Sequence, residues 1–484
     1  MCAINRREFL SQTGKGALAA TLSLALARQA SAASLGASAK KPNIIYFMAD
    51  DLGYAHLGCY GQKLIQTPNA DQLAREGTRF TQTYAGCTVC APSRSVLMTG
   101  LHMGHTPVRT NPGGVSIRDE DVTVAEVLKQ AGYATGLFGK WGLGDARTPG
   151  IPTRQGFDAA FGYLHQVHAH FYYPEYLWHN EEKYPLPGNA GGKKGQYSAD
   201  VILDKALDFI RSNKDRPFFC YLPTTLPHSE LAVPEETLKM YAGKFPEEPF
   251  ANPRPGYAAP REPKATLAAM ITHMDKCFGR VMALLKELGL DENTIVFFTS
   301  DNGGPGSYGA RGDFFKANGP LRDYKTSMYE GGLRVPMIVR WPGKIKAAAT
   351  NNNLVWYFAD VMPTLADLAG TKPPKGIDGI SVLPTLLGED VVGRKQQTHD
   401  FLYWELITGM RLQQAVRMGD WKAVRVKQEA PLEIYNLRDD LGETKNVAAE
   451  HPDVVARIEA YLKTCRTEPP PQIEPDKPEG QRWR

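Results

Sequence analysis

Four short, nearly continuous apolar runs constrain the fold of this chain more than any other feature. They cover residues 43–49, 218–222, 294–299 and 335–339. Runs that are apolar at almost every position are typical of strands buried on both faces of a parallel sheet. Helical periodicity lies between them, over residues 121–130, 198–210 and 267–290. Strands that alternate with helices predict an α/β fold, with a large, mostly parallel mixed sheet flanked by helices.

The pattern changes after residue 388. Short runs of strand type follow at 401–406, 415–418, 421–426 and 432–437, and residues 454–462 have helical periodicity. This pattern favours a smaller C-terminal α+β domain with a short antiparallel sheet. We therefore divide the chain into a signal peptide (1–32), a leader remnant (33–40), a large domain (41–388), a C-terminal domain (389–466) and a Pro-rich tail (467–484).

The first 32 residues have the features of an export signal. Arg6 and Arg7 precede a modest apolar run at 16–27, and a small-x-small cleavage pattern follows at 30–32. This arrangement is typical of a twin-arginine signal peptide, which predicts a protein that is exported, periplasmic or secreted. The apolar run is shorter than the roughly 20 residues that span a bilayer, so we expect no membrane span.

Composition narrows the function classes. The formal net charge is only +4, and most of it lies in the predicted leader, so the rest of the chain has no basic footprint for nucleic acid. Seven cysteines in 484 residues are too few for a disulfide scaffold. We therefore expect no nucleic-acid partner and no fold that depends on disulfides.

Oxygen-bearing side chains follow two of the predicted buried strands. Asp50 and Asp51 come directly after the first apolar run, and Asp301 and Asn302 come just after the run at 294–299. Ligands of open parallel sheets bind at the carboxyl ends of the strands, so these side chains are candidates for one site. Carboxylate and amide oxygens suit Ca²⁺ or Mg²⁺ better than zinc. Turn formation and helix capping are the alternative uses of such residues.

One segment carries a sharper signal, Cys90-Ala91-Pro92-Ser93-Arg94, followed by Ser95-Val96-Leu97-Met98-Thr99-Gly100. It resembles the signature of the type I sulfatases, in the alkaline-phosphatase-like superfamily. The resemblance covers most of residues 41–388 and extends more loosely over the C-terminal domain. It implies an arylsulfatase-like carbohydrate sulfatase in which a maturation enzyme oxidises Cys90 to formylglycine.

The chemistry of sulfate ester hydrolysis is consistent with such a modification. A thiol is a poor nucleophile for this reaction, whereas a hydrated aldehyde offers two hydroxyls on one carbon, one for attack and one for sulfate release. We expect Pro92 to set the turn and Ser93 to cap the following helix, which places residue 90 at a helix N-terminus that favours anions. The spacing of Cys87 and Cys90 leaves a redox pair, a structural disulfide or an inert thiol as alternatives.

The resemblance also implies roles for other residues. Arg94 would hold the aldehyde hydrate or a sulfate oxygen, and Lys140, in Gly139-Lys140-Trp141, would bind sulfate. His228, after Pro227, would bind sulfate or protonate the leaving alcohol, and Lys325 would be the second cation at the leaving group. The implied metal set, for Ca²⁺ with Mg²⁺ as the alternative, is Asp50, Asp51, Cys90, Asp301 and Asn302.

The sequence departs from the family pattern at Gly142, where the family usually has a histidine that deprotonates the second hydroxyl. We expect a nearby loop to supply a substitute or to bind substrate; hydrogen bonds to the loop backbone and aromatic packing are the alternative uses of its residues. Its candidate residues are His165, His168, His170 and Tyr173. Aromatic side chains stack on sugar rings, so this loop favours a carbohydrate substrate.

The resulting hypothesis is hydrolysis of sulfate esters, on a sulfated carbohydrate, with release of inorganic sulfate. A phosphonate monoester or phosphodiester hydrolase of the same superfamily is one alternative, because tetrahedral anions look alike to such a site. The other is a non-catalytic glycan-binding protein with an unmodified Cys90, which Gly142 favours.

Overall fold

The structure is a computed structural model that describes residues 40–228, 230–248, 257–306, 314–409, 411–471 and 473. The predicted signal peptide, nearly all of the leader remnant and most of the Pro-rich tail lie outside these residues. Within the described ranges, we find no helix with both the length and the apolar character needed to cross a membrane.

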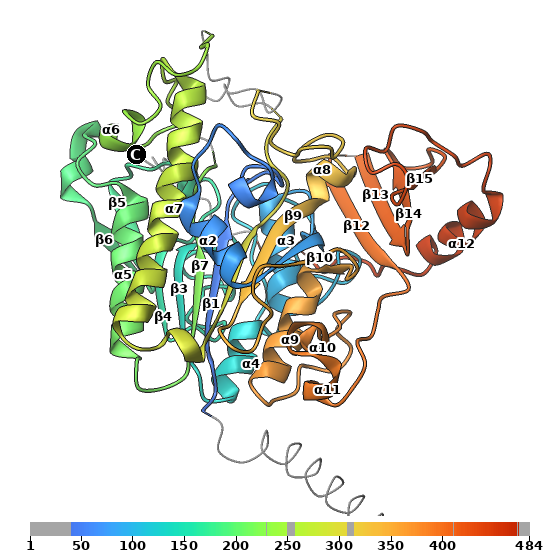
Figure 1. The fold of residues 1–484 in the computed structure, drawn as a ribbon, viewed down its shortest axis with the longest axis horizontal. Coiled ribbons are helices and arrows are strands. Elements are labelled where there is room, and N and C mark those ends of the chain that lie inside the picture. Colours follow the sequence, from blue (N-terminus) through green and yellow to red (C-terminus); the bar gives the residue numbers. More distant parts are fainter. Residues whose placement is uncertain are drawn as a thin grey trace, which may run out of the picture.

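An 11-stranded sheet forms the centre of the molecule (Figure 1). Its order is β10-β2-β9-β8-β1-β7-β3-β4-β5-β6, and β11 also pairs with β2. The strands are β1 (Asn43–Ala49), β2 (Thr78–Tyr84), β3 (Ala134–Lys140), β4 (Ala159–Tyr163), β5 (Tyr176–His179), β6 (Glu182–Pro185), β7 (Phe218–Pro223), β8 (Thr294–Ser300), β9 (Arg334–Arg340), β10 (Ala349–Asn351) and β11 (Trp356–Tyr357). The central pairs are parallel, but β9 runs antiparallel to both β8 and β2. The predicted mixed, mostly parallel sheet is confirmed.

The four apolar runs become β1, β7, β8 and β9 because both faces of these strands are buried. Along β1, Ile44 and Tyr46 enter one hydrophobic core, whereas Ile45 and Phe47 enter the other. Each core lies between the sheet and a layer of helices, so no position of the strand faces water. This double burial accounts for the absence of polar alternation in the sequence.

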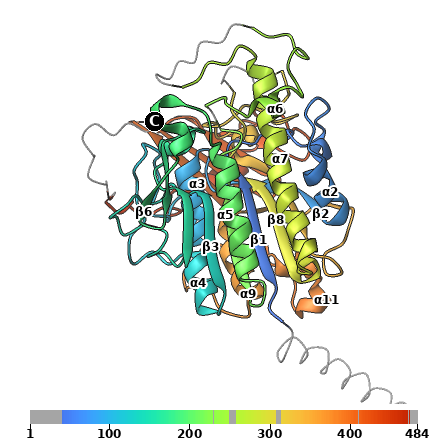
Figure 2. The same cartoon turned by 90° about the vertical axis from the view of Figure 1, so that its left-hand side faces the viewer.

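Helices cover both faces of the sheet (Figure 2). One layer contains α2 (Pro68–Glu76), α5 (Ser198–Ser212) and α7 (Pro263–Glu287), and the other contains α3 (Cys90–Thr99), α4 (Val124–Gln130) and α9 (Val361–Leu368). The shorter helices are α6 (Glu235–Leu238), α8 (Glu330–Leu333), α10 (Leu383–Leu387) and α11 (Glu389–Val392). Helix α4 begins later than predicted because Thr123 and Glu126 form a capping box at its start.

A smaller unit follows in the sequence and lies at the right of Figure 1. It is a four-stranded antiparallel sheet of β12 (Leu402–Thr408), β13 (Arg411–Met418), β14 (Trp421–Arg425) and β15 (Glu433–Asn436), with α12 (Pro452–Leu462) beside it. The predicted α+β character is confirmed, while the boundary at residue 388 stays a prediction.

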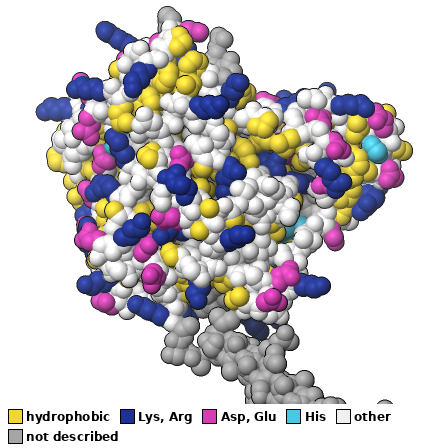
Figure 3. Space-filling model, viewed as in Figure 1, with side chains coloured by type: hydrophobic (Ala, Val, Ile, Leu, Met, Phe, Trp, Pro, Cys, Tyr) yellow, Lys and Arg dark blue, Asp and Glu magenta, His cyan; other side chains and the backbone are white. Residues whose placement is uncertain are grey.

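Basic and acidic side chains are intermixed over the face shown in Figure 3.

Candidate active site

The ends of β1 and β8 bring four oxygen-bearing side chains together. The two strands are adjacent, parallel and in register, so the segments that follow them meet. Asp50, Asp51, Asp301 and Asn302 are all fully buried. The backbone N–H of Asp51 donates to Asp301 Oδ1 at 3.1 Å, and Asn302 Nδ2 donates to Asp51 Oδ1 at 2.7 Å. The convergence expected from the sequence is present in the structure.

Cys90 lies against this group at the first residue of α3. Its Sγ is 3.5 Å from Asp50 Oδ1 and 3.4 Å from Lys325 Nζ. Burial raises the pKa of the Cys90 thiol to about 12, although Lys140 and Lys325 act in the opposite direction. An unmodified Cys90 is therefore a protonated thiol, which is a weak nucleophile.

The start of α3 differs from the prediction in one respect. The helix begins after Val89, and no side chain caps it. Ser93 lies inside the first turn, where its Oγ accepts from the Gly86 N–H at 3.0 Å and donates to the Asp301 carbonyl at 2.5 Å. The predicted cap is therefore wrong, because the helix starts three residues earlier than Ser93. Instead, Ser93 ties α3 to the end of β8.

Cys87 and Cys90 do not form a pair. Both are free cysteines, and the Cys87 Sγ lies 3.5 Å from the carbonyl oxygen of Glu405 in β12. The Cys87 side chain therefore contacts β12, whereas the Cys90 side chain contacts the acidic cluster. The structure therefore has no disulfide between them, and the redox-pair and inert-thiol alternatives stay untested.

Three basic side chains approach the carboxylates from other strand ends and loops. Lys140, the last residue of β3, is fully buried and its Nζ lies 2.7 Å from Asp50 Oδ2. Lys325 Nζ lies 2.6 Å from Asp51 Oδ1. His228, which follows β7, places Nε2 3.4 Å from Asp51 Oδ2. These predicted residues therefore lie together around the acidic pair.

Arg94 contacts Asp301 and the backbone of Lys140. Its Nε and Nη2 donate to Asp301 Oδ2 at 3.2 and 2.9 Å, and a third donor reaches the Lys140 carbonyl. Burial opposes the charge of Arg94, but Asp301 and Asp50 outweigh it and hold the pKa of the guanidinium above its usual value. Arg94 thus fixes Asp301, and its predicted contact with sulfate stays a prediction.

Asn302 provides an observation that favours a cation. Its Nδ2 donates to Asp51 Oδ1 and to the Gly303 carbonyl, which fixes the orientation of the amide. Its Oδ1 is buried and has no hydrogen-bond partner among the residues that the structure describes. Leaving such an oxygen unsatisfied is costly. With the three carboxylates it forms a set of hard oxygen ligands that fits Ca²⁺ or Mg²⁺.

One of the predicted loop histidines, His170, contacts the cluster, and another, His165, contacts Asp145. The His170 ring stacks on the His228 ring, with centroids 4.0 Å apart. His170 Nδ1 also lies 2.5 Å from the hydroxyl of Tyr257, a residue that no sequence motif singles out. His165 is partly exposed and places Nε2 3.8 Å from Asp145 Oδ2. Burial raises the pKa of Asp145 to about 7.

The other two loop residues lie elsewhere. His168 is fully buried between the rings of Tyr163 and Tyr176, with centroids 4.9 and 4.7 Å from its own. This aromatic packing favours a structural role for His168, and its substrate-binding assignment stays a prediction. Tyr173 is half-buried and packs on Tyr197, which leaves its assignment as a prediction.

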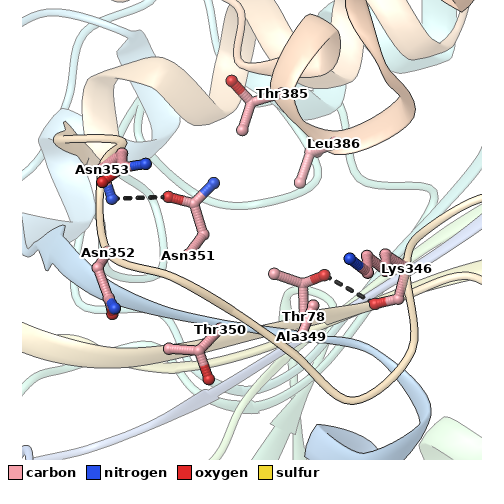
Figure 4. Close-up of a pocket in the computed structure, with 9 residues that line it drawn as sticks. All are labelled: Thr78, Lys346, Ala349, Thr350, Asn351, Asn352, Asn353, Thr385 and Leu386. Carbon is pink, nitrogen blue, oxygen red and sulfur yellow. Dashed lines mark hydrogen bonds between the residues drawn. The ribbon is translucent and has the colours of Figure 1, made fainter.

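A hollow lies away from this cluster, at the edge strand β10 (Figure 4). Its volume is about 310 Å³, and it is lined by Thr78, Lys346, Ala349, Thr350, Asn351, Asn352, Asn353, Thr385 and Leu386. The lining contains none of the buried carboxylates. We therefore place the candidate active site at the strand ends in the centre of the sheet and not in this hollow.

Comparisons with known proteins agree with this geometry. The chain is 30% identical over 513 residues to the N-acetylgalactosamine-6-O-sulfatase of Bacteroides thetaiotaomicron, with 89% of this chain and 94% of the relative covered. It is 32% identical over 479 residues to human arylsulfatase A, with 87% of each chain covered. A solved structure of Ps i-CgsB in complex with k-i-k-neocarrahexaose matches with a TM-score of 0.74 and 28% identity, over 89% of this chain and 94% of that one.

Family sequence patterns extend over nearly the whole described chain. The pattern described as N-sulphoglucosamine sulphohydrolase, C-terminal, matches residues 323–468, which include the four-stranded sheet. The pattern described as Sulfatase matches residues 42–371, which include the large sheet and every residue of the buried cluster. On this evidence the chain belongs to the sulfatase family of sulfuric ester hydrolases.

Proposed function

We propose that this sulfatase removes sulfate from a carbohydrate, with a formylglycine formed from Cys90 and a bound divalent cation, Ca²⁺ with Mg²⁺ as the alternative. One observation carries the proposal. Cys90 begins a buried helix within 3.5 Å of Asp50, in the cluster that also holds Asp51, Asp301 and Asn302. The strand ends thus offer one enclosed position for a cation beside residue 90.

The cation would be held by the oxygens of these four residues, with residue 90 beside them. When bound, it supplies Lewis-acid stabilisation of negative charge on sulfate oxygens. The modification supplies two hydroxyls on one carbon, the requirement for covalent catalysis followed by release of sulfate.

Basic side chains of the chain stabilise the rest of the negative charge on the sulfate group. Lys140 and Lys325 flank the carboxylates within 2.7 Å of Asp50 and Asp51, where they can hold sulfate oxygens. His228 lies on the same side as Lys325 and donates a proton to the departing alcohol. Arg94 orients Asp301, and its charge opposes the rise in the pKa of that carboxyl that burial and Asp50 cause.

The substrate class is inferred from two sources. The relatives include an N-acetylgalactosamine-6-O-sulfatase and a protein solved with an oligosaccharide. In this chain, His165, His170 and Tyr173 belong to an aromatic loop that follows β4 and reaches the cluster at His170. Aromatic faces and ring nitrogens suit the recognition of a sugar.

The burial of α3 has a consequence for maturation. All ten residues of this helix, Cys90–Thr99, are buried. A maturation enzyme therefore needs access to Cys90 before the chain folds. Modification before folding is compatible with export in the folded state through the predicted twin-arginine signal. Such export would deliver a periplasmic or secreted enzyme.

The test combines mass analysis with turnover. The chain is produced with and without a formylglycine-generating enzyme, and the peptide that holds Cys90 is analysed by mass spectrometry. We expect aldehyde at position 90 only in the first sample, and sulfate release from aryl sulfates and sulfated saccharides in proportion to aldehyde content. Faster turnover of phosphonate monoesters or phosphodiesters would favour the phosphoester alternative. Saccharide binding by an unmodified thiol form, with no turnover in either sample, would favour the glycan-binding alternative.

A further inference from the structure

A buried glutamine fills the space beside Gly142. The backbone of Gly142 has a φ of +78°, and a Cβ added there would lie 2.3 Å from Gln166 Oε1. Gly142 comes two residues after Lys140, whose Nζ contacts Asp50. The absence of a side chain at position 142 is therefore what allows the Gln166 amide to occupy the space that such a side chain would take.

The same amide is linked to the start of α3. Gln166 Nε2 donates to Asn111 Oδ1 at 3.4 Å, and Asn111 Oδ1 also accepts from the backbone N–H of Ala91 at 3.2 Å. Ala91 directly follows Cys90. Asn111 is only partly buried and precedes the exposed Pro112, so this link lies close to the surface.

These contacts determine which way the Gln166 amide points. Because Asn111 Oδ1 is the acceptor for Ala91, the group of Gln166 that faces it must be the donor, Nε2. Oε1 is thereby turned toward Gly142. Gln166 is 3% exposed, and its Oε1 has no hydrogen-bond partner among the residues described here. A buried carbonyl oxygen of this kind requires a donor.

We propose that Gln166 is a binding residue of the active site, whose amide oxygen accepts a hydrogen bond from a hydroxyl group when substrate is present. An anionic sulfate oxygen cannot fill this position, since it has no proton to donate. Two hydroxyl groups have the required chemistry, a sugar hydroxyl next to the sulfated position and a hydroxyl of the hydrated group at position 90. The inference rests on the sulfatase function proposed above and adds a requirement for a hydroxyl donor.

The test uses Gln166→Met, because methionine keeps the length and flexibility of the side chain but loses both amide groups. Gln155→Met is the matched control. Gln155 is 1% exposed, its Oε1 also lacks a partner within the described ranges, and its Nε2 binds the carbonyls of Arg118 and Pro149. It lies near Thr123 and Thr135, beyond the amino end of β3 and away from the cluster.

Turnover is measured on a sulfated saccharide and on 4-nitrophenyl sulfate, which carries no hydroxyl, with aldehyde content and thermal stability recorded for each variant. We expect Gln166→Met to lower kcat/KM by about tenfold, the effect of one lost hydrogen bond. A loss on the saccharide alone assigns the sugar hydroxyl, and an equal loss on both substrates assigns the hydroxyl at position 90. Gln155→Met is expected to lower stability without changing kcat/KM on either substrate.

A second readout does not depend on turnover. Saccharide binding to Cys90→Ala protein, with glutamine or methionine at position 166, is measured by calorimetry. Unchanged kcat/KM on both substrates together with unchanged saccharide affinity would overturn the inference. A wild-type enzyme with aldehyde at position 90 that turns over neither substrate would contradict the proposed function instead.

Discussion

Two of the buried clusters of charge among the described residues lie at the carboxyl ends of β1 and β8 and between the large sheet and the four-stranded sheet. In the second region, Lys422 Nζ lies 2.9 Å from Glu330 Oε1 and 3.4 Å from Glu443 Oε1. The Tyr84 hydroxyl donates to Glu330 Oε2 at 2.7 Å, and the Glu330 N–H donates to Glu443 Oε2 at the same distance. We call Glu330, Lys422 and Glu443 the interface triad.

The two regions differ in how completely their polar atoms are satisfied. Each carboxylate oxygen of the interface triad has a protein donor. At the strand ends, by contrast, the buried Asn302 Oδ1 lacks a protein partner among the described residues, and so does Gln166 Oε1 nearby. Burial of charge alone therefore does not distinguish a catalytic site from a structural one. An unsatisfied acceptor alone does not either, since Gln155 Oε1 also lacks a partner within the described ranges; the strand ends differ in placing such acceptors beside buried carboxylates and a cysteine.

The largest expected contrast separates two neighbouring cysteines. We expect Cys90→Ala to lower kcat by about 10⁴-fold or more, because it removes the residue that becomes the nucleophile, with little effect on the free energy of unfolding. Cys87→Ala should leave kcat nearly unchanged and lower stability by about 1 kcal/mol, since it removes a buried contact with β12. Turnover and urea denaturation of both variants check this. Substantial activity in Cys90→Ala would refute its assignment.

A second contrast separates two fully buried lysines. Lys422→Met leaves Glu330 and Glu443 buried without their cation, so we expect the free energy of unfolding to fall by about 3–5 kcal/mol, with kcat per folded molecule unchanged. Lys140→Met should lower kcat by about 10²- to 10³-fold through loss of charge stabilisation. Chemical denaturation and kinetics on both proteins give the comparison. A large loss of kcat in folded Lys422→Met protein would break the proposed division of roles.

Metal removal should affect only the strand-end cluster. Chelation is expected to abolish turnover, and saturation with Ca²⁺ at about 100 times Kd should restore about 2.7 kcal/mol of stability by mass action. Melting curves with and without added cation measure this. Replacing Asn302 with leucine should remove most of the response. A melting temperature that is insensitive to both chelator and cation would count against a resident metal.

The smallest effect that we expect is a dependence of stability on pH, which arises from Glu443 of the interface triad. Burial, together with the Glu330 carboxylate, raises the pKa of Glu443 from 4.5 to about 7, even though Lys422 acts the other way. Between these values the unfolded chain releases the proton while the folded protein retains it. Stability therefore falls by about 1–3 kcal/mol as pH rises from 4.5 to 7. Glu443→Gln should flatten this part of the pH profile measured by urea denaturation; an unchanged slope would contradict the assignment.

The sequence predicted the strand-end cluster because its residues lie at positions with local signals. Asp50 and Asp301 follow strands that are recognisable from continuous apolar runs, and Cys90 lies in a short signature. Gln166 and Asn111 were missed because their role depends on one close approach to Gly142 and one to Ala91. Such contacts join loops, and no periodicity specifies them.

The interface triad was missed for a similar reason. Glu330 lies at the start of α8, Lys422 in β14 and Glu443 in a later loop, so only tertiary packing brings them together. Short strands such as β10 and β11 were also missed, since two or three residues carry too little pattern. His168 shows the converse, because the sequence of an aromatic loop does not reveal which of its histidines is buried between other rings.

The most direct test of this account is a crystal structure of the chain after maturation, in the presence of Ca²⁺. We predict a cation within bonding distance of Asn302 Oδ1 and of the three carboxylates of Asp50, Asp51 and Asp301, next to an aldehyde hydrate at position 90. An intact thiol at that position in fully active enzyme, or an Asn302 oxygen bound only by water or protein donors, would contradict it.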